Sequence, residues 1–111
     1  MTEQRPEVQH VVLFSFAPPL SPEEEADMAA RIRSWPAEIG GFTTLRFGTD
    51  LTGARTQGYS YLLYTQFPDQ DALARYQDHP IHRAFAEWVV RRQGRVLAFD
   101  YLLDATTVVV G

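Results

Sequence analysis

Residues 8–16 constrain the fold more than any other segment, because they read as a strand that is apolar on both faces. Their sequence, VQHVVLFSF, is rich in β-branched and aromatic residues and ends at the breakers Pro18 and Pro19. One face carries His10, Val12, Phe14 and Phe16, and the other carries Val11, Leu13 and Ser15. A strand of this kind is usually covered on both sides. One layer of helices covers one face of so small a domain, so we expect the other face to meet a second copy in a homodimer.

The length of 111 residues suits one domain. We therefore expect a single unit over residues 1–111, with its core at 8–103 and a C-terminal tail at 104–111. The apolar stretch 106–110 is expected to lie as an added strand along the partner or along its own sheet edge. The net charge of −4 gives no basic surface for nucleic acid.

Two absent residue types remove classes of chemistry. Without cysteine the chain has no thiolate nucleophile and no zinc–thiolate site, and without lysine it has no side-chain Schiff base. Residues 1–9 are polar and do not resemble a signal peptide, and no apolar run approaches the roughly 18 to 20 residues that span a membrane. We expect a cytoplasmic protein that needs no cofactor and contacts no membrane.

Capping and breaker residues divide the rest of the chain into elements. Ser21 and Glu24 form a capping pattern that begins a helix, and Pro36 followed by Gly40 and Gly41 closes it. The patterns predict further strands over 42–47, 59–67 and 95–103, and helices over 69–78 and 81–92, which Pro80 separates. The resulting order is β-α-β-β-α-β with a broken second helix, the ferredoxin-like α+β class. The polar loop 48–58 is a candidate flap over a pocket.

The histidines are the first candidates for proton transfer, because an unperturbed imidazole titrates near neutral pH. His82 shares a helix face with Phe85 and Val89. If the helices cover the strand face that carries His10, then His10 and His82 approach each other. His79 is placed at a helix N-cap. Two other interpretations remain open. A histidine on an apolar face is often a hydrogen-bonded core residue, and imidazole is a common metal ligand, so the three histidines are also compatible with a metal site.

Tyr76 and His82 form the most promising pair, because both point toward the core from the broken helix, on either side of Pro80. We expect the Tyr76 hydroxyl to hydrogen bond to one ring nitrogen of His82. Such a bond would fix the tautomer of the imidazole and leave its other nitrogen as a base.

Four stretches resemble the Dabb family, the stress-responsive dimeric A/B barrel domains. They read QHVVLFSF, GYSYLLYTQF, DALARYQDHPIHRAF and VLAFDY, and the resemblance extends over residues 8–101. It implies a ferredoxin-like monomer whose sheet packs on that of a partner to form a dimeric α+β barrel, with a pocket under the helices of each subunit.

Within this resemblance, the chain is similar to plant polyketide cyclases of the olivetolic acid cyclase type, which close a linear polyketide by aldol condensation without a cofactor. Their catalytic tyrosine and histidine fall on Tyr76 and His82, and their strand-one histidine falls on His10. A second strand histidine is replaced by Tyr61, and a tyrosine of their first helix falls near Ile32. The substrate contacts implied by this comparison and by the helix faces are Tyr61, Phe14, Ile32, Phe85 and Val89.

Three functions remain open from the sequence. In the first, His82 takes a proton from carbon next to a carbonyl, and His10 or Tyr61 stabilises the oxyanion. In the second, the same residues form a polar patch in an apolar pocket of a dimer that binds a small ligand without catalysis. The third, a cofactor-free monooxygenase, fits less well because such enzymes often use asparagine, which this chain lacks.

Overall fold

The computed structural model describes residues 5–111, which form one antiparallel sheet and three helices. In chain order the elements are β1 (Glu7–Phe16), α1 (Pro22–Glu38), β2 (Thr44–Thr49), β3 (Tyr61–Phe67), α2 (Gln70–Asp78), α3 (Pro80–Arg91) and β4 (Gly94–Leu103). The strand order across the sheet is β2-β3-β1-β4, which puts β1 in the interior and β4 at one edge. The predicted ferredoxin-like class with a divided second helix is confirmed.

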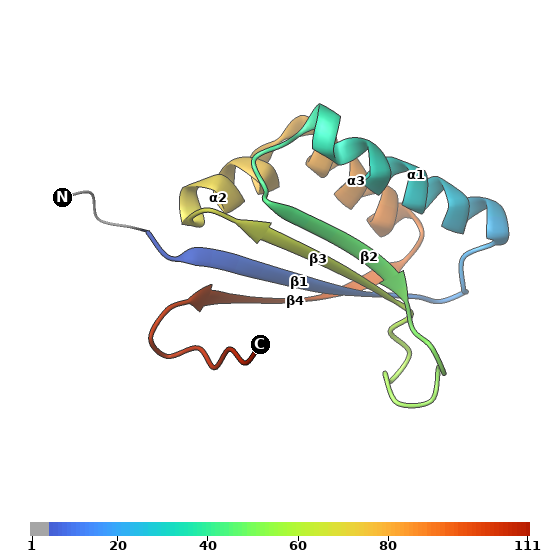
Figure 1. Cartoon of the computed structure of the whole chain (residues 1–111). Helices are drawn as coiled ribbons and strands as arrows, with labels where there is room; N and C mark the ends of the chain where they lie inside the picture. Colours follow the sequence, from blue (N-terminus) through green and yellow to red (C-terminus); the bar gives the residue numbers. More distant parts are fainter. Residues whose placement is uncertain (1–4) are drawn as a thin grey trace.

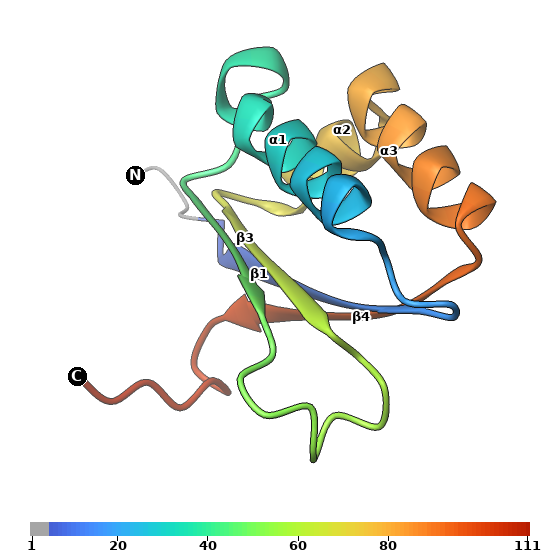
Figure 2. The same ribbon diagram turned by 90° about the vertical axis from the view of Figure 1, so that its right-hand side faces the viewer.

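All three helices lie on one face of the sheet, and the opposite face has no helix over it (Figures 1 and 2). The burial of β1 alternates along its whole length, because Val8, Val12 and Phe16 point under the helices. The core therefore fills the space between helices and sheet. It consists mainly of aromatic and aliphatic side chains from β1, β3 and the three helices.

Local sequence signals fix the helix ends. The Ser21 side chain accepts a hydrogen bond from the Glu24 backbone, and the Glu24 carboxylate accepts one from the Ser21 backbone, which completes the predicted capping box. Helix α1 continues through Pro36 and ends at Glu38, within the segment from Pro36 to Gly41 that was predicted to close it. It closes where the backbone N–H groups of Ile39 and Gly40 both donate to the Trp35 carbonyl, and Gly40 has the left-handed φ of 68° typical of this position.

The predicted second strand starts two residues later than expected, at Thr44. Phe42 turns instead into the core, where its ring lies edge-on to those of Phe67 and Tyr76. Packing of this ring, rather than β-propensity, decides where β2 begins.

The tail does not add a strand to its own sheet. Residues after Leu103 form a turn and then an irregular segment, and Val108, Val109 and Val110 are 88%, 69% and 92% exposed. It leaves β4 and runs on the helix-free side of the sheet (Figure 1). Within residues 5–111, no helix is long and apolar enough to cross a membrane.

Candidate functional site

An apolar cavity of about 260 Å³ lies between the sheet and helix α3. Its floor comes from β1, β3 and β4, and its wall comes from α2 and α3. The lining residues are His10, Val12, Phe14, Leu63, Tyr76, Gln77, His82, Phe85, Ala86, Val89, Val90, Gly94, Val96 and Ala98. Few polar side chains converge in a largely apolar hollow, which is the usual character of a small-molecule site.

The cavity has an apolar rim between α3 and the edge strand β4. Val90 on the helix is 71% exposed and Val96 on the strand is 52% exposed, although both line the hollow. A bound molecule would therefore place its polar part inward, near the histidines, and its apolar part toward this rim.

Most of the site residues predicted from the sequence meet here. The structure brings together His10, Phe14, Tyr76, His82, Phe85 and Val89. Tyr61 and Ile32 lie elsewhere: the Tyr61 hydroxyl donates to Glu25 of α1 at 2.6 Å, and Ile32 is buried in the core. The loop between β2 and β3, the candidate flap, lines a different hollow at the end of the sheet. His79 caps α3 as predicted, because its Nδ1 accepts from the backbone of Ile81 at 3.1 Å.

Tyr76 and His82 face each other across the bend between α2 and α3. Their ring centroids are 4.5 Å apart. The expected hydrogen bond between them is wrong, because the buried Tyr76 hydroxyl has no hydrogen-bond partner among residues 5–111. Burial raises the pKa of this phenol, so it keeps its proton at neutral pH. An unpaired buried hydroxyl costs stability.

His82 is held in its neutral form. Burial lowers its pKa below the ordinary value, and a hydrogen bond with the backbone of Gln77 partly opposes this shift. A neutral imidazole carries one N–H and one lone pair, so His82 has one ring nitrogen that can accept a proton.

His10 has a carboxylate partner that the sequence reading did not identify. It is 4% exposed, and its Nδ1 hydrogen bonds to Asp100 of β4. The two residues face each other in the register of β1 and β4. Its ring centroid also lies 6.1 Å from that of Tyr76, so two imidazoles, His10 and His82, lie near the phenol ring. No motif marks Asp100, because only the pairing of two distant strands places it beside His10.

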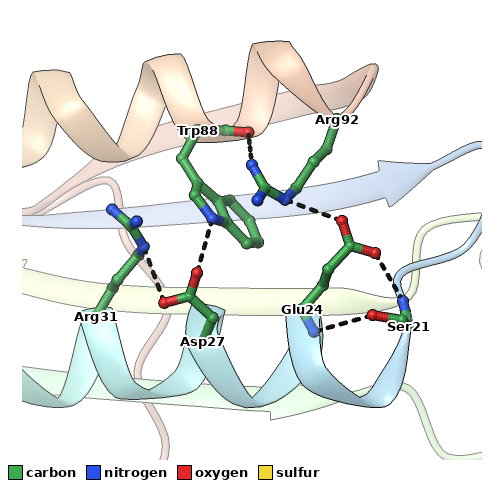
Figure 3. Close-up of polar contacts among 6 residues, drawn as sticks. All are labelled: Ser21, Glu24, Asp27, Arg31, Trp88 and Arg92. Carbon is green, nitrogen blue, oxygen red and sulfur yellow. Dashed lines mark hydrogen bonds and ion pairs between the residues drawn. The ribbon is translucent and has the colours of Figure 1, made fainter.

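Helix α3 is tied to α1 by a polar network at its C-terminal half (Figure 3). Asp27 accepts from the Trp88 indole N–H at 3.0 Å, and Glu24 accepts from Arg92 at 3.0 Å. The Arg92 guanidinium also lies 4.1 Å from the centre of the Trp88 ring, within range of a cation–π contact. These contacts fix the helix that carries the cavity wall.

The arrangement can hold a ligand and move a proton. One phenol donor and two imidazoles surround the inner end of an apolar cavity, which are the groups that general acid–base chemistry uses. Among residues 5–111, no three histidine or carboxylate side chains are arranged to hold a metal ion.

Comparison with known proteins gives consistent results. Residues 8–103 match the family model for the stress-responsive A/B barrel domain, Dabb. The stress-response A/B barrel domain-containing protein HS1 of Arabidopsis thaliana is 29% identical over 102 residues, which cover 91% of this chain and 94% of that protein.

Two solved structures illustrate the range of proteins with this fold. A hydroxynitrile lyase from Passiflora edulis superposes with a TM-score of 0.79 at 17% identity, covering 95% of this chain and 99% of the lyase. A dimeric ferredoxin-like protein from Thermobifida fusca superposes with a TM-score of 0.77 at 24% identity, covering 93% of this chain and 96% of the other. At these identities the two superpositions establish the fold.

Proposed function

This chain belongs to the stress-responsive A/B barrel domain family, and on that premise we propose that its cavity carries out cofactor-independent, cyclase-type acid–base chemistry on a small carbonyl compound. The observation that carries the proposal is the unpartnered Tyr76 hydroxyl in a buried cavity beside a neutral His82. A donor and a base at this spacing suit a carbonyl oxygen and the hydrogen on its neighbouring carbon.

The step needs only the side chains and the ligand. The free ring nitrogen of His82 takes a proton from the carbon next to the carbonyl, and the electrons of that C–H bond form an enolate. The Tyr76 hydroxyl donates a hydrogen bond to the enolate oxygen. In a cyclase-type reaction the enolate carbon attacks a second carbonyl of the same molecule, and His82 returns its proton to the new alkoxide.

Hydrogen exchange on a probe ketone tests this proposal. We choose 2-tetralone, a small benzo-fused cyclic ketone whose carbonyl is flanked by two CH₂ groups, and follow replacement of their hydrogens in D₂O by proton NMR. The protein should accelerate exchange, His82→Gln should abolish the acceleration, and Tyr76→Phe should reduce it about 10- to 100-fold, since positioned proton transfer contributes about 10² to 10⁴.

Binding of the probe separates catalysis from simple ligand binding. If 2-tetralone perturbs the NMR signals of the cavity residues but does not exchange faster than in buffer, the protein binds ligands without this chemistry. That result would refute the enzyme proposal and favour a ligand-binding dimer. Melting temperatures of both variants must stay near that of the wild type for the comparison to hold.

We also propose that the protein works as a homodimer through the helix-free face of its sheet. Leu62, Leu97 and Phe99 on this face are 40%, 52% and 66% exposed. A stable dimer buries about 1,200 to 2,000 Å² in total, and these apolar side chains of β3 and β4 supply a patch of the right character. Sedimentation that shows a monomer at micromolar concentration would refute the proposal.

The tail offers a second test of the dimer. Because its valines find no cover in their own chain, we expect residues 104–111 to lie along the partner. Deleting them should raise the dimer dissociation constant, measured by sedimentation, and an unchanged constant would show that the tail takes no part.

A further inference from the structure

The pair of His10 and Asp100 has a chemical consequence beyond burial. An ionised carboxylate can only accept hydrogen bonds, so the hydrogen between the two residues belongs to Nδ1 of His10. A neutral imidazole carries one N–H, so Nε2 then holds a lone pair. His10 lines the cavity while its Nδ1 is occupied by Asp100, so Nε2 is the ring nitrogen left to a ligand.

This tautomer changes the role open to His10. A lone pair at Nε2 accepts hydrogen bonds and protons, so neutral His10 is not the oxyanion donor that the sequence suggested. The Tyr76 hydroxyl is a donor without a partner among residues 5–111, and neutral His82 carries one lone pair. The phenol ring lies near both imidazoles, each of which can accept a proton.

We propose that Asp100 is a positioning residue that holds His10 with Nε2 toward the cavity, which makes His10 a second proton acceptor opposite His82. This inference rests on the proposed acid–base function and deepens it. The complementary ligand is a carbonyl compound with an acidic hydrogen on each side of the carbonyl group. Tyr76 binds the oxygen, and each histidine faces one of the acidic positions.

The proton step at His10 balances without any other reactant. Nε2 takes a proton from carbon, the electrons of that bond remain on the ligand as an enolate, and the ring becomes an imidazolium. The Asp100 carboxylate stabilises this cation across the Nδ1–H hydrogen bond. The proton then returns from the imidazolium to the enolate carbon.

The location of Asp100 suits a positioning role. It lies on the edge strand, and its side chain is 43% exposed while that of His10 is 5% exposed. Among residues 5–111, His10 is its one ion-pair partner. Removing the carboxylate leaves the buried Nδ1–H of His10 without a partner and lowers stability as well, so the melting temperatures of the Asp100 variants are measured together with the state of His10.

Long-range ¹H–¹⁵N NMR of the histidine rings at about pH 8, where free imidazole is neutral, tests the tautomer directly in the free protein. The signals are assigned with His79→Gln and His82→Gln. Wild-type His10 should show a protonated Nδ1 and a bare Nε2. Asp100→Asn and Asp100→Ala should shift the ring toward the other tautomer, and Glu87→Gln, an equal loss of charge on the α3 surface, should leave it unchanged.

Hydrogen exchange on 2-tetralone tests whether His10 acts as a proton acceptor. The two CH₂ positions are resolved by NMR, and Asp100→Asn should slow exchange at one of them about 10- to 100-fold, a part of the about 10² to 10⁴ that positioned proton transfer contributes. His82→Gln should slow the other position most, and Glu87→Gln should slow neither.

The outcomes separate this inference from the proposed function. An unchanged His10 tautomer in both Asp100 variants, or a wild-type ring protonated at Nε2, overturns the role of Asp100 whatever the catalysis. A changed tautomer with unchanged exchange shows that His10 is not a proton acceptor, while acid–base function through His82 stands. If wild-type protein does not accelerate exchange at all, the proposed function fails, and with it the catalytic role of His10.

Discussion

The two faces of the sheet differ in what covers them, and the strand β3 shows the difference within two residues. Leu63 points under the helices and is 2% exposed, whereas its neighbour Leu62 points to the opposite side and is 40% exposed. The residue type is the same, so residue type alone cannot distinguish their environments. The helix-covered face also holds the histidines and the buried tyrosine, while the helix-free face presents apolar side chains without any cavity chemistry.

The difference between the two faces indicates that one face serves folding and cavity chemistry and the other serves association. Side chains under the helices determine whether the chain folds and what its cavity can do. Side chains on the other face are expected to determine whether two chains associate. Substitutions matched in type but placed on opposite faces can separate these effects.

The largest expected effect comes from truncating the two leucines of β3. Leu63→Ala should lower the free energy of unfolding by about 2–5 kcal/mol, because it leaves a void in the packed core. Urea denaturation at several protein concentrations measures the free energy of unfolding of each variant. The decrease caused by Leu63→Ala should not vary with protein concentration. The decrease caused by Leu62→Ala should vary, because this substitution acts through association of two chains. Equal and concentration-independent losses would contradict the proposed division.

A charge on the helix-free face should weaken the dimer next most strongly. Phe99→Glu places a carboxylate in the expected interface and should raise the dissociation constant about 100-fold, equivalent to about 2.8 kcal/mol. Sedimentation equilibrium measures it. Ala74→Glu, on an exposed position of α2, provides the control and should leave the constant unchanged. If both variants dimerise like the wild type, the interface lies elsewhere.

Two glycines extend the comparison to backbone packing. At Gly94, where β4 follows α3, a Cβ atom would lie 2.4 Å from Val89 Cγ1 and 2.9 Å from the Val89 carbonyl oxygen. Gly94→Ala should therefore cost about 1–3 kcal/mol as overpacking. Gly48 is paired with Leu62 on β3, and a Cβ there meets nothing within 4 Å. Gly48→Ala should change stability by no more than about 0.5 kcal/mol, and thermal unfolding of both variants compares them.

The smallest effect concerns the pH dependence of stability. Burial lowers the pKa of His82 in the folded chain below its ordinary value of 6.5. As pH falls through about 6.5, the unfolded chain takes up a proton that the folded chain does not, so the free energy of unfolding decreases. The His82→Gln variant lacks this uptake and should show a shallower decrease between about pH 7 and about pH 5. Parallel curves for the two proteins would show that His82 titrates normally.

Local signals in the sequence were sufficient to predict most of the helices and strands of the fold. Ser21 and Glu24 define the start of α1, and Asp69 and His79 cap the helices that follow. These contacts join residues two or three positions apart, so they depend little on the rest of the molecule. The start of β2 was misplaced because Phe42 packs in the core, a contact that local propensity does not encode.

The candidate site was anticipated in part. Alternation along β1 and the helical spacing of His82, Phe85 and Val89 correctly indicate which residues share the interior, and the structure brings them to one cavity. Tyr61 projects from the same face of the sheet but reaches Glu25 of α1 instead. Which interior residues meet depends on helix placement over the sheet, and residue spacing does not contain that information.

The sequence by itself determined the elements, their order and the apolar character of both faces of β1, because period and capping are local properties of the chain. Only the tertiary structure decided that Asp100 meets His10, that the Tyr76 hydroxyl stays without a partner, and that the tail leaves its own sheet. The contact between Asp100 and His10 depends on the register of strands far apart in sequence. The state of the Tyr76 hydroxyl depends on which side chains pack around the phenol. Both are therefore fixed only when the whole chain has packed.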